Sequence, residues 1–387
     1  MVLAREVGVN RRFDCALQHR AARIAPNDHA DPAQASIAVS TPRPDTSTVV
    51  DYVFGDRIPA AAALIEVAPG VHWLRMPLPF ALDHINLWAL DDGASWTLVD
   101  CGLNHPDTIE LWERLVAEAL APRPVGRLLV THYHADHVGL AGWHAKRWNA
   151  PLWMSEGEYL TALALYYETP GHHRGSMFDL FRRHGLDEAR IEGMKSFSGA
   201  YRRLITELPH TFRRIMPGEA LSIGGHTWLA LVGYGHAPEH VSLYCAALGI
   251  MIAGDMVLPR ISTNVSVRPV EPEGNPLARF LESLDRFTAL PRGTLVLPSH
   301  GLPFRGMHER IEQLHAHHDE RFADLLAACS EPRCARELVP VLFRRPLDDR
   351  GWYFAMGECI AHLNCLMHAG RLRRESDAEG VLRFIAN

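Results

Sequence analysis

One nine-residue stretch, THYHADHVG at residues 131–139, constrains the fold more than any other feature of the sequence. It follows the apolar run RLLV, which has β character, and it places His132, His134, Asp136 and His137 within six residues. Imidazole and carboxylate groups are costly to crowd together unless something holds them. Both groups are ligands for zinc, iron or manganese. The stretch therefore predicts a metal centre directly after a strand.

Three further strand-like runs end in, or just before, a side chain that can bind metal. TLVD ends in Asp100, IAGD ends in Asp255, and LVLPSH places His300 just beyond its apolar residues. Helical stretches such as residues 105–121 separate several of the runs, and this alternation indicates an α/β protein. A rigid sheet fixes the loops that carry polar groups. We therefore expect the site at these strand ends.

The candidate ligands divide into two sets, because four side chains at positions i, i+2, i+4 and i+5 cannot all point one way. His132 and His134 can serve one ion, and Asp136 and His137 a neighbouring ion. Three more candidates follow along the chain: His236, Asp255 and His300. One ion then receives three imidazoles, the other receives two imidazoles and a carboxylate, and Asp255 can bridge both. Such a pair of ions lowers the pKa of a bridging water towards ~7 and stabilises both the attacking and the departing oxygen.

Three regions of the chain differ in character. Residues 1–60 are rich in Ala, Pro, Asp, Ser and Thr without sustained periodicity, so we expect a mostly disordered extension. The catalytic domain is expected over residues 61–306. Within it, residues 155–215 have helical spacing, and this helical insertion either covers one side of the site or packs away from it. Residues 307–387 read as a long helix, a shorter helix, a third helix and two strands around a turn, which resembles a winged-helix module.

Composition argues against several classes of protein. The net charge is −6, so no global basic field recruits nucleic acid or an acidic membrane. No stretch approaches the ~20 apolar residues of a membrane span, and residues 1–20 contain no apolar run of signal-peptide type. The seven cysteines form no CxxC pair, which argues against a disulfide framework or a thiolate zinc site. We expect a cytoplasmic protein without membrane contact.

Other polar residues of the expected catalytic domain admit two interpretations each. His240 can touch substrate or support a metal ligand, or it can be an ordinary hydrogen-bonded loop residue. Cys101 can lie near the metals, but ordinary packing is favoured because nothing beside it marks a nucleophile. Four side chains of the insertion can line a pocket, although a core or surface position is favoured: Tyr166, Tyr167, His172 and His173.

Two further features lie near the C-terminus. The run HAHHDE, residues 315–320, resembles a metal-binding tract, but a solvated helix face is favoured. Arg371, Arg373 and Arg374 can contact nucleic acid, but three acidic residues follow them and weaken the local field. We therefore favour a structural or dimer-forming role for this end of the chain, and a homodimer is one expectation.

Five motifs between Val71 and Gly301 resemble, in this order, those of the metallo-β-lactamase superfamily: TLVDCG, THYHADHVG, GHAPEH, AGD and LPSHG. The resemblance implies an αββα sandwich of two mixed sheets with metals at the sheet edge. By motif position, the first metal is assigned three ligands, namely His132, His134 and His236. The second metal is assigned Asp136, His137 and His300, with Asp255 as the bridge and Asp100 as a support that orients ligands or waters from behind. The C-terminal end is similar to the LACTB2-like branch of hydrolases, whose members include nuclease and thioesterase activities.

The expected function is hydrolysis of an ester, thioester or lactone of a small molecule by a metal-bridging hydroxide. Asp136 and Asp255 are the expected catalytic carboxylates. Zinc, with two ions per chain, is the expected cofactor, and iron or manganese also suit the ligands. Zinc β-lactamases commonly have Cys where this chain has Asp255, which argues against antibiotic hydrolysis. Two alternatives remain: a mononuclear iron persulfide dioxygenase, and a nuclease or nucleic-acid-binding protein that uses the C-terminal module.

Overall fold

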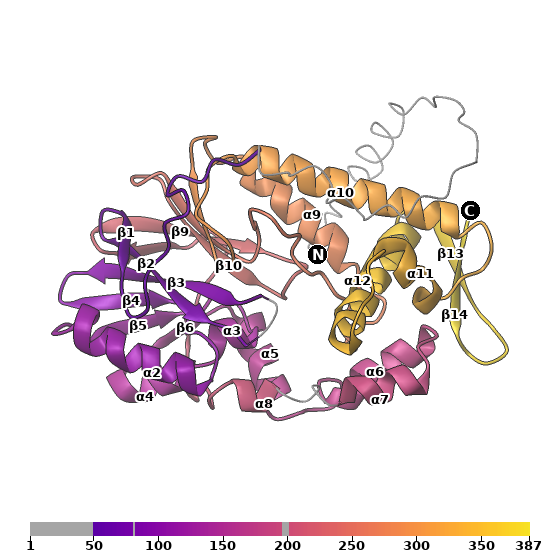
Figure 1. Ribbon diagram of the computed structural model, residues 1–387, viewed down its shortest axis with the longest axis horizontal. Helices are drawn as coiled ribbons and strands as arrows, with labels where there is room; N and C mark the ends of the chain where they lie inside the picture. The colour runs from indigo at the N-terminus through magenta and orange to yellow at the C-terminus, as the bar shows by residue number, and fades with distance from the viewer. Residues whose placement is uncertain (1–48, 80–81, 196–200) are drawn as a thin grey trace, which may run out of the picture. The chain divides into compact units, whose positions relative to one another are not determined.

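Two mixed β-sheets form the centre of the computed structural model, which describes residues 49–79, 82–195 and 201–387 (Figure 1). Neighbouring strands from β1 to β4 pair antiparallel, and those from β4 to β7 pair parallel. The strands of the first sheet lie in the order of the sequence: β1 (Ile65–Ala68), β2 (Val71–Pro77), β3 (His84–Asp92), β4 (Ser95–Val99), β5 (Val125–Leu129), β6 (Leu152–Met154) and β7 (Arg213–Arg214).

The second sheet has the strand order β12-β11-β10-β9-β8, in which β11 and β12 pair parallel and the other neighbours antiparallel. Its strands are β8 (Ala220–Ile223), β9 (His226–Gly233), β10 (His240–Cys245), β11 (Ile250–Gly254) and β12 (Leu295–Pro298). All five residues of β11 are buried. A strand that is covered on both faces has a continuous apolar sequence, which is why IMIAG could be recognised as a strand.

The main core lies between the two sheets. Trp73 and Trp88 of the first sheet and Trp228 of the second belong to this core, and each is at most 1% exposed. A second apolar cluster joins the other face of the first sheet to α2 (Pro106–Leu115) and α4 (Ala141–Trp148). A π-helical turn, η2 (Val116–Leu120), extends α2.

The second sheet is covered on its other face by α9 (Pro276–Phe287), with α10 (Met307–Ala328) beside it (Figure 1). Two mixed sheets packed between outer helices form the αββα sandwich that the sequence predicts, so this expectation is confirmed.

The expected helical insertion lies between β6 and β7. It contains α5 (Glu156–Tyr166), α6 (Arg174–Arg183), α7 (Glu188–Lys195) and α8 (Tyr201–Leu204). Helical spacing continues to residue 215 in the sequence, but the helix ends at Leu204, and that part of the prediction is wrong. Pro209 lacks a backbone N–H and disfavours a helical conformation of the residue before it. The segment instead ends in β7, which pairs with β6.

The C-terminal part contains the three helices and two strands that the sequence predicts. After α10 come α11 (Ala335–Leu342), α12 (Asp349–His368), β13 (Leu372–Ser376) and β14 (Leu382–Ala386). The Asp377 carboxylate accepts hydrogen bonds from the backbone N–H groups of Glu379 and Val381 and so closes the turn between the strands. Helix α12 contacts α7 and α9, so this module packs against the insertion and the second sheet's helix. The winged-helix description stays a prediction.

The N-terminal extension expected over residues 1–60 lies mostly outside the described residues, which begin at 49. Within the described part, Val50 is buried, and Asp51 exchanges two backbone hydrogen bonds with Arg305, of 3.0 and 2.9 Å. Disorder is therefore not the right description for this stretch, because its backbone is paired. Among the described residues, no helix has the length and apolar character needed to cross a membrane.

Candidate metal centre

The candidate ligands lie at the ends of strands and in the loops that follow them. His132 and His134 follow β5, and His134 is the N-cap residue of the short helix α3 (Ala135–Val138). That helix carries Asp136 and His137. The remaining candidates follow β9, β11 and β12 respectively: His236, Asp255 and His300. The two sheets therefore bring all seven side chains to one edge of the sandwich.

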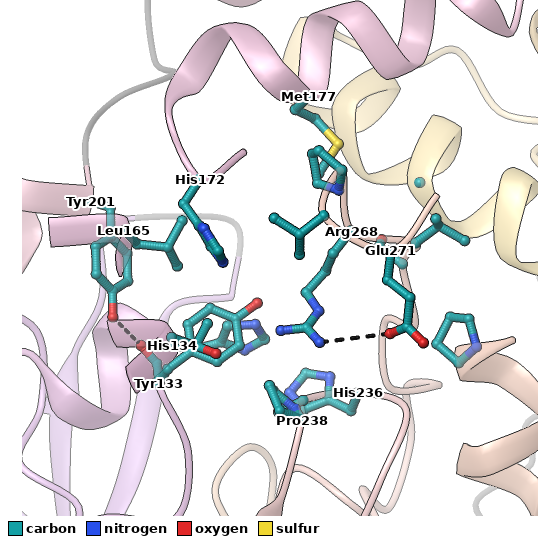
Figure 2. A pocket seen from close by; sticks show the side chains of 18 of the residues that line it. Tyr133, His134, Leu165, His172, Met177, Tyr201, His236, Pro238, Arg268 and Glu271 are labelled. Atoms are coloured by element: carbon teal, nitrogen blue, oxygen red, sulfur yellow. Dashed lines mark hydrogen bonds and ion pairs between the residues drawn. The ribbon is translucent and has the colours of Figure 1, made fainter. Parts of the chain in front are cut away.

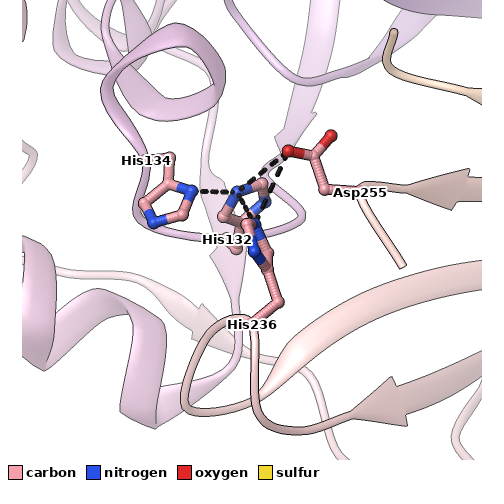
Figure 3. Close-up of side chains that lie close together, drawn as sticks. All are labelled: His132, His134, His236 and Asp255. Carbon is pink, nitrogen blue, oxygen red and sulfur yellow. Dashed lines mark hydrogen bonds and ion pairs between the residues drawn. The ribbon is translucent and has the colours of Figure 1, made fainter. Parts of the chain in front are cut away.

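The first cluster contains three imidazoles and one carboxylate (Figure 3). His132 Nε2 lies 2.9 Å from His134 Nδ1 and 3.2 Å from His236 Nε2. Asp255 Oδ2 lies 3.5 Å from His236 Nε2 and 4.0 Å from His132 Nε2. Each residue offers one ligand atom, and these atoms lie within 4.8 Å of one another, which suits a single ion bound between them.

The second cluster contains Asp136, His137 and His300. Asp136 Oδ2 lies 3.4 Å from His300 Nε2 and 3.7 Å from His137 Nε2. Asp255 Oδ1 lies 3.5 Å from the Nε2 atoms of both His137 and His300. One oxygen of Asp255 therefore faces the first cluster and the other faces the second, which is the arrangement that a bridging carboxylate requires.

Two atoms of the clusters are buried without a hydrogen-bond partner among the described residues, namely His137 Nε2 and Asp255 Oδ1. Such atoms are rare in folded proteins and call for an explanation. Both point at the second cluster, where an ion would satisfy them. Imidazole nitrogens with carboxylate oxygens suit zinc, iron or manganese. The residues present therefore fit a pair of divalent ions.

Hydrogen bonds on the far side of three imidazole rings aim their Nε2 atoms at the clusters. His137 Nδ1 donates to Asp100 Oδ2 at 2.8 Å, His236 Nδ1 to the Asn264 carbonyl at 2.7 Å, and His300 Nδ1 to the His84 carbonyl at 2.8 Å. A ring that donates from one nitrogen keeps the lone pair of the other free to bind metal.

Asp100 lies beside the candidate ligand His137, the position that the resemblance implies for it. Its carboxylate accepts from His137 and from both the backbone N–H and the hydroxyl of Thr131. Its φ of 65° is in the left-handed region, which costs a non-glycine residue about 1–3 kcal/mol. In this conformation the carboxylate reaches both Thr131 and His137.

His240 is fully buried, and its Nε2 accepts a hydrogen bond of 3.1 Å from the backbone N–H of Asp255. It thus supports the bridging carboxylate, as one of its two interpretations expects. Gly254 makes room for this contact, because a Cβ at that position would lie 2.3 Å from His240 Nε2. Gly254 also has a φ of 56°, which favours glycine.

Even without an ion, the surrounding residues keep most of the candidate ligands in the deprotonated form that metal binding needs. Burial lowers the pKa of His134 to about 3 and lowers that of His132 strongly. Burial alone would raise the pKa of Asp136. The protonated rings of His137 and His300 outweigh this effect and lower the pKa to about 2. Burial alone would lower the pKa of His300. The carboxylates of Asp255 and Asp136 outweigh this effect and raise the pKa to about 10. For His137 too, burial lowers the pKa, but Asp100 and Asp255 outweigh it and raise the pKa well above its usual value. An ion at the second cluster would therefore displace a proton from each of these two rings.

A buried glutamate that the sequence did not point out ties the insertion to both histidine loops. Glu158 of α5 is fully buried, and its carboxylate accepts from the backbone N–H groups of Tyr133, at 2.9 Å, and Glu239, at 2.6 Å. Burial raises its pKa to about 7. A second link comes from the C-terminal module, where Asn264 donates to the Glu358 carboxylate of α12 at 3.2 Å.

A cavity of about 550 Å³ opens beside the first cluster and includes His134 and His236 in its lining (Figure 2). Its walls come from the insertion, from the loop that precedes α9, and from α12 of the C-terminal module. His172 and His173 line it, as the pocket interpretation expects, and His173 is also exposed at the surface. The insertion therefore covers one side of the site, which decides between the two expectations for it.

Tyr166 and Tyr167 are not among the lining residues. Tyr167 is half exposed and donates from its hydroxyl to the Glu207 carboxylate, while Tyr166 lies under the Arg202 guanidinium. Cys101 is fully buried, and burial raises its pKa, which agrees with ordinary packing.

The tract at residues 315–320 is not simply a solvated helix face. His318 is 1% exposed, and its Nδ1 lies 3.1 Å from His362 Nε2 in the interior of the C-terminal module. His315 is partly buried, and its Nε2 forms a hydrogen bond of 2.8 Å with Asp285 Oδ1. Near the end of the chain, Arg374 pairs with Glu273, so the arginines there are partly neutralised.

Comparison with protein families matches residues 81–300 to the metallo-beta-lactamase superfamily. This segment contains all seven candidate ligands and more than half of the chain. The chain belongs to the metallo-β-lactamase superfamily. Residues 322–387 match a further family, the metallo-beta-lactamase-like C-terminal domain, so the superfamily accounts for the C-terminal module as well.

Solved structures of the superfamily agree over most of the chain. A beta-lactamase domain protein from Burkholderia ambifaria is 48% identical with a TM-score of 0.83, and the match covers 88% of this chain and 99% of that one. The metallo-beta-lactamase family protein TTHA1429 from Thermus thermophilus is 30% identical with a TM-score of 0.72, covering 83% and 100%. The probable metallo-hydrolase YqjP of Bacillus subtilis (strain 168) is 25% identical over 310 residues, 76% of this chain and 91% of YqjP.

Proposed function

We propose that this protein is a hydrolase of esters, thioesters or lactones that uses two divalent ions, with zinc as the native metal. The observation that carries the proposal is the position of Asp255, whose two oxygens face two separate clusters of ligands. Membership of the superfamily and the likeness to a probable metallo-hydrolase support hydrolysis as the reaction class.

The bound ions would supply Lewis-acid polarisation of the scissile carbonyl and an activated water as nucleophile. The chain's own residues hold this centre in place. Asp100, Asn264 and His84 orient three ligand rings, and His240 fixes the backbone of the bridging carboxylate. Asp136 keeps 20% of its side chain exposed against 10% for Asp255. Asp136 is therefore the carboxylate that substrate or water can reach more easily.

The cavity supports a small molecule as substrate. Its volume of about 550 Å³ lies within the range of roughly 300–1,000 Å³ typical of such sites. His134 and His236 belong to its lining, so a carbonyl group bound beside them would meet the first cluster while the rest of the molecule lies between the insertion and α12. We place the reaction in the cytoplasm, where the six described cysteines, all buried and free, would stay reduced.

The test is a screen of thioesters, esters, lactones and phosphodiesters on zinc-loaded protein, with metal content measured on the same sample. The proposal expects turnover of a carboxylic ester or thioester that chelation stops and zinc restores. Turnover of phosphodiesters alone would favour the nuclease alternative. A single bound iron with oxygen consumption on a persulfide substrate would favour the dioxygenase alternative.

A further inference from the structure

Arginine dominates the charged lining of the cavity. Five arginines and two glutamates line it: Arg202, Arg203, Arg268, Arg279, Arg350, Glu168 and Glu271. The chain as a whole carries a net charge of −6, so this excess of positive charge is local to the cavity. A cleft lined by one sign of charge attracts ligands of the opposite sign.

Arg268 is the arginine best placed to contact a ligand. In Figure 2 its guanidinium points into the cavity on the side of His134 and His236. Within the described part of the chain, its ion pair is with Glu271, at 4.0 Å, and its guanidinium makes no hydrogen bond. Glu271 is shared, since it lies closer, at 3.4 Å, to Arg279. The Arg268 charge also acts on the buried Glu158 carboxyl and on Tyr133, but the guanidinium donates no hydrogen bond to either. Its N–H groups can therefore bind a carboxylate or a phosphate through two parallel hydrogen bonds.

Apolar side chains also belong to the lining. Val270 and Phe354 are 43% and 44% exposed, although both belong to the cavity wall, and Leu165 and Met177 complete an apolar surface. Large apolar side chains exposed inside a concave site are typical of ligand contacts. The cavity thus combines an anion-binding group with a surface for a hydrocarbon chain.

We propose that the substrate carries an anionic group, a carboxylate or a phosphate, which Arg268 binds at a distance from the scissile carbonyl. This inference rests on the proposed function, because it deepens the choice of substrate for the same site. Arg268 then acts as a specificity residue, and Glu271 opposes it by partly neutralising its charge.

Three ligands of equal chain length test anion binding without turnover. Pentanoate, glutarate and 4-phosphonobutyrate each offer one carboxylate to the zinc-loaded site, and the last two add a second anionic end. By calorimetry we expect glutarate or 4-phosphonobutyrate to bind about tenfold tighter than pentanoate, since one charge-assisted hydrogen-bond pair is worth about a factor of ten. The tighter of the two identifies the group as carboxylate or phosphate.

Variants that should weaken the preference for a second anionic group, and one that should strengthen it, test whether Arg268 is responsible. Arg268→Met keeps the apolar stem and should abolish the preference, Arg268→Lys should keep part of it, and Glu271→Gln should increase it. Arg292→Met, at an exposed ion pair outside the cavity, is the control and should leave it unchanged. Equal binding of the three ligands, or a preference that persists in Arg268→Met, would overturn the inference.

Hydrolysis separates this inference from the proposed function. The 4-nitrophenyl monoester of glutarate should exceed 4-nitrophenyl pentanoate about tenfold in kcat/KM, and Arg268→Met should remove the difference through KM. Hydrolysis of both esters at equal rates would uphold the reaction and contradict the role of Arg268. Hydrolysis of neither ester would count against the proposed ester chemistry, while the binding comparison would still decide on Arg268.

Discussion

The ligand clusters and the cavity beside them are built from different parts of the molecule. The seven candidate ligands lie at the edge of the two sheets, each close to the end of a strand, and most are buried. The cavity walls come from helices of the insertion and from α12, and they keep large apolar side chains exposed. The sheets can therefore fix the chemistry, while the appended helices can change substrate choice without moving a ligand.

The two regions nevertheless meet at two carboxylates. Glu158 of the insertion holds the backbone of both histidine loops, and Glu358 of α12 holds the side chain of Asn264, whose carbonyl orients His236. The helices that shape the cavity thus also brace the clusters. The following variants separate bracing from substrate contact.

The largest effect is expected where ligands are removed. His132→Ala combined with His134→Ala leaves the first cluster without two of its imidazoles, so the first ion should be lost and hydrolysis abolished. The fold should persist, because the core between the sheets does not use these side chains. Metal analysis, circular dichroism and turnover measure the three quantities. Unchanged metal content with full activity would reject the site.

A smaller effect is expected at Asp100. Asp100→Asn replaces an oxygen that accepts hydrogen bonds with an N–H group, so His137 loses its orientation. Loss of such a support typically costs about 10–100-fold in metal affinity or activity. Asp91→Asn, which removes a carboxylate paired with Arg123 at the surface, is the matched control. Equal behaviour of the two variants in a metal titration would show that Asp100 does not support the ligands.

The buried Glu158 carboxyl should make the stability of the folded protein depend on pH. Because its pKa is about 7 in the folded protein and near 4.5 when unfolded, the folded protein holds an extra proton between these values. Stability should therefore fall as pH rises from about 4.5 to about 7, by up to about 3 kcal/mol from this group. Denaturant unfolding across that range should show a shallower fall for Glu158→Gln. Parallel pH profiles for both proteins would contradict this account of the buried carboxylate.

The smallest effect is expected at the cavity wall. Phe354→Ala removes an exposed aromatic ring from the lining but no ligand or hydrogen bond of the clusters. We expect KM for an apolar ester to rise about 3–10-fold, the value of a partial loss of apolar contact, with kcat and metal content unchanged. A loss of bound metal in this variant would mean that α12 braces the clusters through more than Glu358.

The sequence alone points to the candidate ligands because their signal is local. His132, His134, Asp136 and His137 lie in one stretch, and Asp255 and His300 follow apolar runs that can be recognised alone. The supports of the rings have no such signal. His84 acts through a backbone carbonyl on His300, and Glu158 acts on Glu239, and no spacing links residues so far apart.

The parts of the fold that could not be predicted from the sequence are short strands and a buried side chain. Strand β7 is a pair of arginines, and β6 has three residues, so neither presents a periodic pattern. The interior position of His318 depends on His362, which lies in a different helix. These features are decided by tertiary pairing, whereas α10 and β11 follow from their own sequences.

The central claim is a centre of two ions joined by Asp255, and counting metal tests it most directly. Wild-type protein and Asp255→Ala are titrated with zinc, dialysed and analysed by inductively coupled plasma mass spectrometry, with turnover measured on the same samples. The account predicts two zinc ions per wild-type chain, with reduced occupancy of both positions and sharply lower turnover in Asp255→Ala. Saturation of the wild type at one ion, or two tightly bound ions in Asp255→Ala, would contradict it.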